Sequence, residues 1–314
     1  MKFKPNIINK RDLGIELLRV VLCFWIVLVH CLSPSFLTII IYKYNYHVPC
    51  FIFISFYFFY TTLSKRDINR IKNRFIRLLI PFWTWPIIIW IFNNICFYYF
   101  SKNRFNRFLS YNDLKIQLLL GRRFYRQLWF LFNLLLFTLA FLIISFILKK
   151  NFLFLFQILA IMIYILQYSG ITIKLFHNYK DCIECSIGHC FATYPISIIA
   201  LTFSSMKAIP TLKFNTFKII FLSTMLMYLI FKYDIFLDIN YGYYGFKKAI
   251  FAFLAFIIFG SLSIEKCKNE MLKIIIKRIT QYTQGIFCLH YIVRFYFLKI
   301  FQIKKSGIKY IIII

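Results

Sequence analysis

The chain has 314 residues, of which 61% are hydrophobic, 22% aromatic and only 16% charged. A soluble domain of this size cannot bury so much apolar surface, so the composition excludes an ordinary soluble enzyme and indicates a membrane protein. The formal net charge of +29 raises the alternative of a nucleic-acid-binding protein. However, the basic residues form short clusters between apolar runs, without a continuous basic domain or binding motif. We therefore expect membrane lipid, and no nucleic acid, as a partner.

Apolar runs follow one another along the whole chain, and most are long enough to cross a bilayer. They cover residues 14–37, 48–63, 78–100, 128–148, 152–173, 187–205, 216–231, 246–264 and 285–301. These runs predict an all-α fold, a polytopic bundle of about nine to ten transmembrane helices that forms one domain over residues 1–314. The final segment, "GIKYIIII", gives only about 12 Å of helix. It is therefore expected to be a stub or the start of a truncated span.

Basic residues on either side of the first two runs predict the orientation of the chain. One cluster precedes the first run and another follows the second: Lys2, Lys4, Lys10 and Arg11, then Lys65, Arg66, Arg70, Lys72, Arg74 and Arg77. Positive charge favours the cytoplasmic side, so we expect a multi-pass protein of the cell membrane with a cytoplasmic N-terminus. The segment 101–127 places seven basic residues on the opposite side. We expect this segment to be re-entrant or to lie on the membrane surface. The alternative is that a compositional bias of the genome, which enriches lysine throughout the chain, obscures the preference of basic residues for the cytoplasmic side.

The first apolar run carries polar residues on one helical face. Arg19 and His30 are eleven residues apart, about three helical turns or about 16 Å along the axis. Glu16 lies one turn before Arg19, and Cys23 falls between the two. Ionisable residues within a span usually face a bundle interior or a water-filled cavity, which makes them candidates for a functional site. The alternative is structural, with interhelical hydrogen bonds and an arginine that extends toward the interface.

An arginine, ten residues and then a histidine in the first span resemble the signature of the acyltransferase-3 family, integral membrane enzymes that acylate, most often O-acetylate, carbohydrates. Four later segments resemble family spans in the expected order: "HVPCFIFISFYFF" (47–59), "RFIRLLIPFWTW" (74–85), "QLWFLFNLLLF" (127–137) and "GIFCLHYIV" (285–293). Phe56 departs from the glycine that the family carries after Ser55. This departure argues against close helix packing there and, with the short C-terminus, favours an inactive member.

The resemblance implies acetyl-coenzyme A or a similar donor on the cytoplasmic side, and a carbohydrate or lipid-linked sugar as acceptor. Histidine titrates near neutral pH, so His30 is the expected general base for the acceptor hydroxyl. Arg74 and Arg77 lie one turn apart and are the expected ligands of the donor's phosphates, with Arg19 facing the same cavity. Ordinary membrane anchoring is the alternative for this pair.

A second histidine and a cysteine-rich segment leave further alternatives open. His290, which the resemblance also places in a late span, lines the acceptor side of the cavity or hydrogen-bonds a neighbouring helix. Cys182, Cys185, His189 and Cys190 stand close in the sequence. Zinc ligation is not expected there, because a second, more distant ligand pair is missing and adjacent His189 and Cys190 are awkward for one ion. A short disulfide between Cys182 and Cys185 is the alternative, with Cys190 acting as a small hydrophobe.

Three functions are compatible with these patterns. An acyltransferase uses a donor-facing cavity and a base. A polysaccharide or small-molecule transporter with the same helical fold would use a translocation pathway and catalyse no reaction. An inactive family member would keep only the fold. The pairing of Arg19 and His30 with Arg74 and Arg77 favours the enzyme.

The orientation can be tested by labelling introduced cysteines from outside the cell. A cysteine at Asn69, in the basic turn after the second run, is expected to stay unlabelled by an impermeant reagent, whereas one at Tyr44 is expected to react. The unaltered chain provides the background for both. Labelling at Asn69 would contradict both the predicted cytoplasmic N-terminus and the prediction that the acyl donor binds on the cytoplasmic side.

Overall fold

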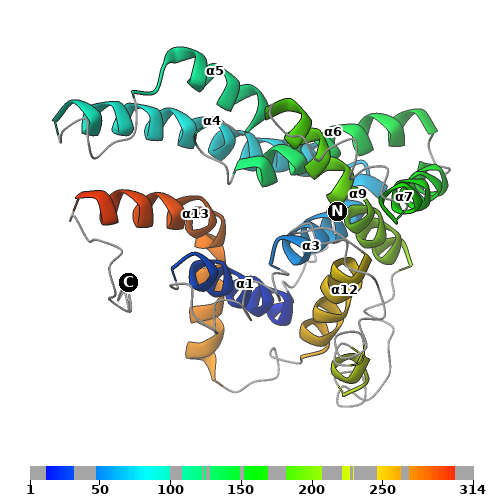
Figure 1. Cartoon of the computed structure of the whole chain (residues 1–314). Coiled ribbons are helices and arrows are strands. Elements are labelled where there is room, and N and C mark those ends of the chain that lie inside the picture. The colour runs from blue at the N-terminus through cyan, green and yellow to red at the C-terminus, as the bar shows by residue number, and fades with distance from the viewer. Residues whose placement is uncertain are drawn as a thin grey trace, which may run out of the picture.

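The computed structural model describes residues 12–31, 47–99, 108–121, 124, 128–148, 152–168, 182–206, 221–226, 229, 246–262 and 269–300. The helices are α1 (Leu13–Cys31), α3 (His47–Ser64), α4 (Ile68–Tyr99), α5 (Tyr111–Leu120), α6 (Trp129–Leu148), α7 (Phe152–Tyr168), α9 (Cys182–Ser205), α12 (Phe246–Ser261) and α13 (Glu270–Ile300). Within these ranges the secondary structure is helical and contains no strand. The predicted all-α bundle is thereby confirmed (Figure 1).

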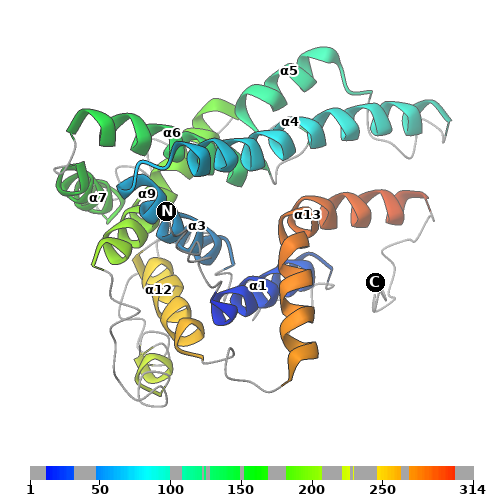
Figure 2. The ribbon, with the colours of Figure 1, turned by 180° about the vertical axis from the view of Figure 1, so that it is seen from behind.

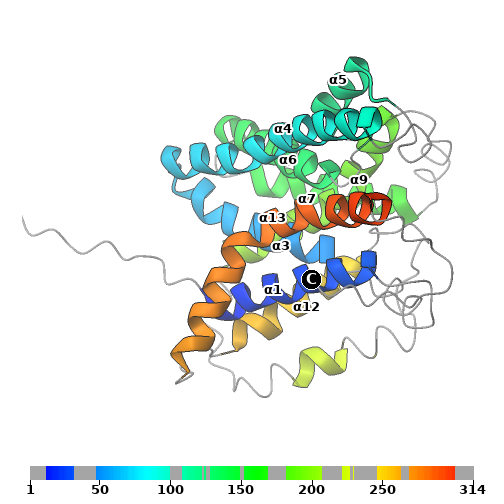
Figure 3. The ribbon, with the colours of Figure 1, turned by 90° about the vertical axis from the view of Figure 1, so that its left-hand side faces the viewer.

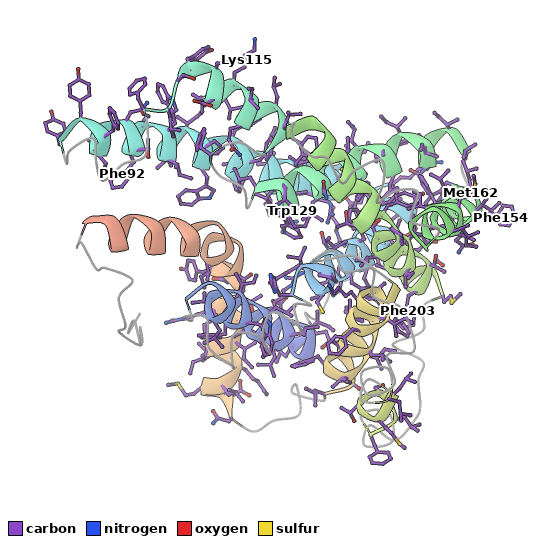
Figure 4. All side chains as sticks on the ribbon, viewed as in Figure 1. Phe92, Lys115, Trp129, Phe154, Met162 and Phe203 are labelled. Carbon is purple, nitrogen blue, oxygen red and sulfur yellow. The ribbon has the colours of Figure 1, made fainter. Side chains whose placement is uncertain are left out.

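Three of the described helices are both long and apolar enough to cross a membrane, namely α3, α4 and α6, and α7 and α12 contain shorter apolar stretches. Large apolar side chains are exposed on several helices. In Figure 4, Phe154 and Met162 of α7 point away from the bundle. Such surface is suited to contact with lipid. The chain is therefore a helical membrane protein, and nine to ten spans remains a prediction. The terminal segment 307–314 lies outside the described residues.

Helix α3 lies at the centre and packs against α1, α4, α6, α9 and α12. Three phenylalanines one turn apart, Phe53, Phe56 and Phe59, are 0–1% exposed. Phe53 meets Phe203 of α9 and Phe256 of α12, with ring centroids 6.4 and 5.1 Å away. The labelled Phe203 lies between these two helices in Figure 4. Aromatic packing around one helix therefore fixes the positions of its neighbours.

Helix α4 begins well before the apolar run that was predicted to start at residue 78. Asp67 accepts a hydrogen bond from the backbone amide of Arg70 at 3.1 Å and forms an ion pair with its side chain, which starts the helix at Ile68. With 32 residues α4 is about 48 Å long, more than the hydrocarbon core requires. The basic residues that follow the second run are therefore helical, and they continue directly into the span. Figure 2 shows the length of α4 from behind.

The basic segment 101–127 contains a short helix, α5, which lies alongside α4. Ser110 and Asp113 form a capping box at its start, and Gly121 ends it with φ of 66°. Asn94 of α4 accepts from the Leu109 amide and donates to its carbonyl oxygen, at 2.9 and 3.0 Å. Ten residues cannot cross a bilayer, so α5 by itself is not a membrane span. That the segment 101–127 is re-entrant or surface-lying stays a prediction.

Helices α1 and α12 cross closely at Gly14. A methyl group at Gly14 would overlap the carbonyl oxygen of Phe259, which belongs to the α12 backbone. At Gly285, by contrast, an added methyl group meets nothing within 4 Å.

Gly14→Ala is therefore expected to destabilise the protein by about 1–3 kcal/mol, the usual cost of overpacking. Gly285→Ala is the matched control and is expected to cause no destabilisation. Thermal unfolding of the purified variants in detergent measures both. Equal stability of the two variants would contradict the close crossing at Gly14.

Candidate active site

Arg74 joins three helices through its guanidinium group. From α4 its Nε donates to Thr138 Oγ1 of α6 at 3.0 Å. Its two terminal nitrogens donate to the Ser55 carbonyl oxygen and the Ser55 Oγ of α3, at 3.1 and 2.9 Å. Three of the five guanidinium N–H groups thus have acceptors within the protein, so the orientation of Arg74 is fixed.

Two aromatic rings of α3 lie beside the same guanidinium group. The Cζ atom of Arg74 is 4.6 Å from the ring centroid of Phe59 and 5.2 Å from that of Phe56, close enough for cation–π attraction. Phe56 is 0% exposed and also packs edge-on against Phe141 of α6, with ring centroids 5.3 Å apart. Phe56, the residue that puts close helix packing in doubt, is thus buried and packed between helices. Its ring fills the space between α3 and α6 and forms part of the surroundings of the Arg74 guanidinium group.

Arg19, Arg74 and Arg77 line one cavity between α1, α3, α4, α6 and α13, with a volume of about 310 Å³. The other lining residues are Phe51, Ile54, Ser55, Phe58, Leu78, Phe130, Leu131, Leu134 and Thr283. Among these described residues three carry guanidinium groups and none carries a carboxylate. The cavity is therefore positively charged and attracts anions.

Arg19 is held at the α1 side of the cavity. Its guanidinium group lies 3.5 Å from Glu16 Oε1 and 5.9 Å from the ring centroid of Phe58. Glu16 itself is buried, and its Oε2 has no hydrogen-bond partner among the described residues. The contact with Phe58 places the first half of α1 beside the last turns of α3, so the two helices are antiparallel. The sequence prediction that Arg19 and the pair Arg74 and Arg77 face one cavity agrees with this geometry.

A second cavity, of about 500 Å³, adjoins the first and shares Phe58, Arg74 and Arg77 with it. The remaining lining residues are Phe59, Thr62, Arg70, Asn73 and Ile76. These belong to the end of α3 and the beginning of α4, so the second cavity leads toward the basic turn between the two helices. Arg77 stands where the two cavities meet; its side chain is exposed, and its Nε donates to the Asn73 carbonyl oxygen at 3.2 Å.

The two histidines predicted for the site lie on helices that border the cavity. His30 is eleven residues after Arg19 on α1, so about 16 Å of helix separates their backbones. His290 is in the second half of α13, seven residues after the cavity residue Thr283. Both histidine side chains lie outside the described residues, so their roles stay predictions.

The cysteine-rich segment forms the start of α9. Cys190 donates from its Sγ to Asn133 Oδ1 of α6 at 2.9 Å, and Asn133 in turn donates to Thr193 Oγ1 at 3.1 Å. Cys190 is therefore a member of a polar contact between two helices as well as an apolar side chain. The side chains of Cys182, Cys185 and His189 lie outside the described residues. In the described part of the chain, no group of three or more possible metal ligands occurs.

The sequence did not identify Thr138, which accepts a hydrogen bond from Arg74, or Thr283, which lines the cavity. Thr138 is 0% exposed and is the hydroxyl residue in the apolar run "LLLFTLAF". A hydroxyl in so apolar a run is a signal for an interhelical hydrogen bond, but it does not identify the partner. Thr283 precedes the last apolar run, and only the packing of α13 on α1 brings it to the cavity.

These features define a membrane-embedded helical bundle with a basic cavity at one end. The sequence matches the family of the acyltransferase domain over residues 12–314. The chain therefore belongs to the acyltransferase-3 family, a family of membrane acyltransferases, as the motifs predicted. Comparison with curated proteins and with solved structures gives no match.

The acceptor on α6 provides a test of the Arg74 arrangement. Thr138→Val keeps the side-chain shape but removes the acceptor for Arg74 Nε, and is expected to destabilise the protein by about 1.5–3 kcal/mol. Thr138→Ser is expected to restore most of this stability. Thr84→Val, which removes an exposed hydroxyl that contacts only its own helix, is the control. Thermal unfolding in detergent measures all three, and equal effects at Thr138 and Thr84 would contradict the role of the Arg74 contact.

Proposed function

We propose that this protein transfers an acyl group, expected to be acetyl, from a cytoplasmic acyl-coenzyme A to a hydroxyl of a carbohydrate or lipid-linked sugar. The observation that supports the proposal is the convergence of Arg19, Arg74 and Arg77 on one cavity. The coenzyme A moiety carries a diphosphate and a further phosphate. Guanidinium groups bind such anions through planar, charge-assisted hydrogen bonds.

The three arginines have different parts in this proposal. Arg74 has three N–H groups engaged by Ser55 and Thr138, so it supplies a fixed positive charge and at most two further donors. Arg77 is exposed at the junction of the two cavities and is the proposed phosphate ligand. Arg19 neutralises the donor from the opposite wall. Arg70 and Asn73 line the outer cavity, through which the donor would enter.

His30 is the proposed general base. Its imidazole nitrogen takes the proton of the acceptor hydroxyl as the hydroxyl oxygen attacks the thioester carbonyl. The carbon–sulfur bond then breaks, and the leaving thiolate receives the proton from the imidazolium, which regenerates the base. The pantetheine arm of coenzyme A separates its phosphates from its thioester. A base about three helical turns from Arg19 is therefore compatible with phosphates held at the arginines.

The acceptor is proposed to approach from the opposite end of the bundle. Because α1 and α3 are antiparallel, the His30 end of α1 lies toward the start of α3, away from the turn between α3 and α4. His290 follows the cavity residue Thr283 along α13 and is the proposed residue of the acceptor side.

Two variants separate donor binding from chemistry. Arg77→Ala is expected to weaken acyl-coenzyme A binding by about 1.5–3 kcal/mol, because it removes a charge-assisted hydrogen bond. His30→Gln keeps hydrogen-bonding capacity without a base, so it is expected to bind donor normally and to lower acyl transfer at least about a hundredfold. Calorimetry with a non-hydrolysable donor analogue and a radiolabelled transfer assay measure the two effects.

Lys72→Ala is the control, because Lys72 is exposed on α4 and lies outside both cavities. It is expected to leave donor affinity unchanged. Transfer activity retained by His30→Gln would show that the histidine only links helices. Donor affinity unaffected by Arg77→Ala would favour membrane anchoring for that arginine, and with it a transporter or an inactive protein.

A further inference from the structure

The first half of α13 lies crosswise to the bundle. Figure 3 shows this half, in orange, steeply inclined to α1 before the second half turns to run along α1. Thr280 Oγ1 lies 3.3 Å from the carbonyl oxygen of Glu16, near the start of α1. The crosswise half, residues 270–283, therefore lies at the end of the bundle where α1 begins and α3 ends.

One face of this half-helix is docked on α1. Ile276, Thr280 and Thr283 are 3–7% exposed. The Cys23 Sγ donates to the Thr283 carbonyl oxygen at 3.4 Å and adds a second contact between the two helices. The spacing of three and four residues places the docked side chains on one side of the helix. The half-helix is thus held in its orientation by buried contacts.

The other face combines exposed apolar and basic side chains. Met271, Ile274 and Tyr282 are 46–68% exposed and lie along one stripe. Arg278 is exposed within this stripe, and Lys277 is exposed at its flank. Apolar side chains that alternate with cations on a helix parallel to the membrane surface are typical of interfacial helices.

We propose that the crosswise half of α13 lies in the membrane interface and binds anionic phospholipid headgroups. Met271, Ile274 and Tyr282 reach the boundary of the acyl chains, while Lys277 and Arg278 bind lipid phosphates. Lys273 is engaged by Glu270, with Nζ and Oε1 2.7 Å apart, and so contributes less.

The arrangement favours lipid over a protein partner. A helix that lies across the end of a membrane-spanning bundle meets the headgroup layer, and its cations complement the negative potential of anionic leaflets. The buried face fixes the depth of the exposed stripe relative to the spans. The proposal is independent of the proposed function, although Thr283, at the end of the half-helix, also lines the basic cavity.

The test uses the full chain in nanodiscs of phosphatidylcholine alone or of phosphatidylcholine mixed with phosphatidylglycerol. Hydrogen–deuterium exchange of residues 270–283 is expected to be slower in the mixed nanodiscs. Native mass spectrometry then measures bound phosphatidylglycerol. Lys277→Gln combined with Arg278→Gln is expected to weaken this binding about tenfold to thirtyfold, since each cation near an anionic surface contributes about fivefold.

The control replaces Lys65 and Lys72 by glutamine, because both are exposed basic residues of the α3–α4 region. It is expected to weaken phosphatidylglycerol binding less than the loss of Lys277 and Arg278 does, because the proposed binding site is on α13. Equal exchange in the two nanodisc types would overturn the proposal, and this comparison needs no variant. Equal loss of bound phosphatidylglycerol in the two double variants would also overturn it. So would hydrogen–deuterium exchange of residues 270–283 that depends on protein concentration and not on lipid, because this would indicate that a second copy of the chain covers this face.

Discussion

A guanidinium group within a membrane-embedded bundle requires acceptors, because leaving it unpaired in a medium of low dielectric constant is costly. Arg74 obtains them from two helices other than its own, Ser55 on α3 and Thr138 on α6, and two phenylalanine rings lie beside it. The relative positions of α3, α4 and α6 depend on this contact. So does the shape of the basic cavity, because Ser55 and Arg74 both line it.

The arrangement also relates stability to function. Three guanidinium groups around one cavity repel one another, and the repulsion decreases when an anion binds between them. Glu16 offsets part of the charge at Arg19, and Ser55 and Thr138 accept hydrogen bonds from Arg74 without adding negative charge. The cavity therefore has a positive potential, which is suited to a phosphate-bearing donor. Phe56 is 0% exposed, and its ring lies beside the Arg74 guanidinium group.

Much of the fold follows from the apolar pattern, because an apolar run of sufficient length in a membrane protein is helical. The bounds of α3 and α6 differ by at most one residue from the predicted runs 48–63 and 128–148. Helices α4 and α13 begin earlier than their runs, because hydropathy marks the part of a helix within hydrocarbon and not its polar extension. The first half of α13 was missed for this reason: its charges interrupt the apolar run without interrupting the helix.

The candidate site was only partly predictable. Arg19, Arg74 and Arg77 could be named because ionisable residues are costly within or beside spans and their spacing places them on shared faces. Thr138 and Thr283 could not, since their parts in the site come from packing between segments that are distant in sequence. The central claim, acyl transfer to a carbohydrate with His30 as base, is tested most directly by mass spectrometry of surface glycans from cells that produce the wild-type chain, the His30→Gln chain or neither. We expect glycans heavier by one acyl group only with the wild-type chain, and the same acylated glycans with His30→Gln would contradict the role of His30 as base.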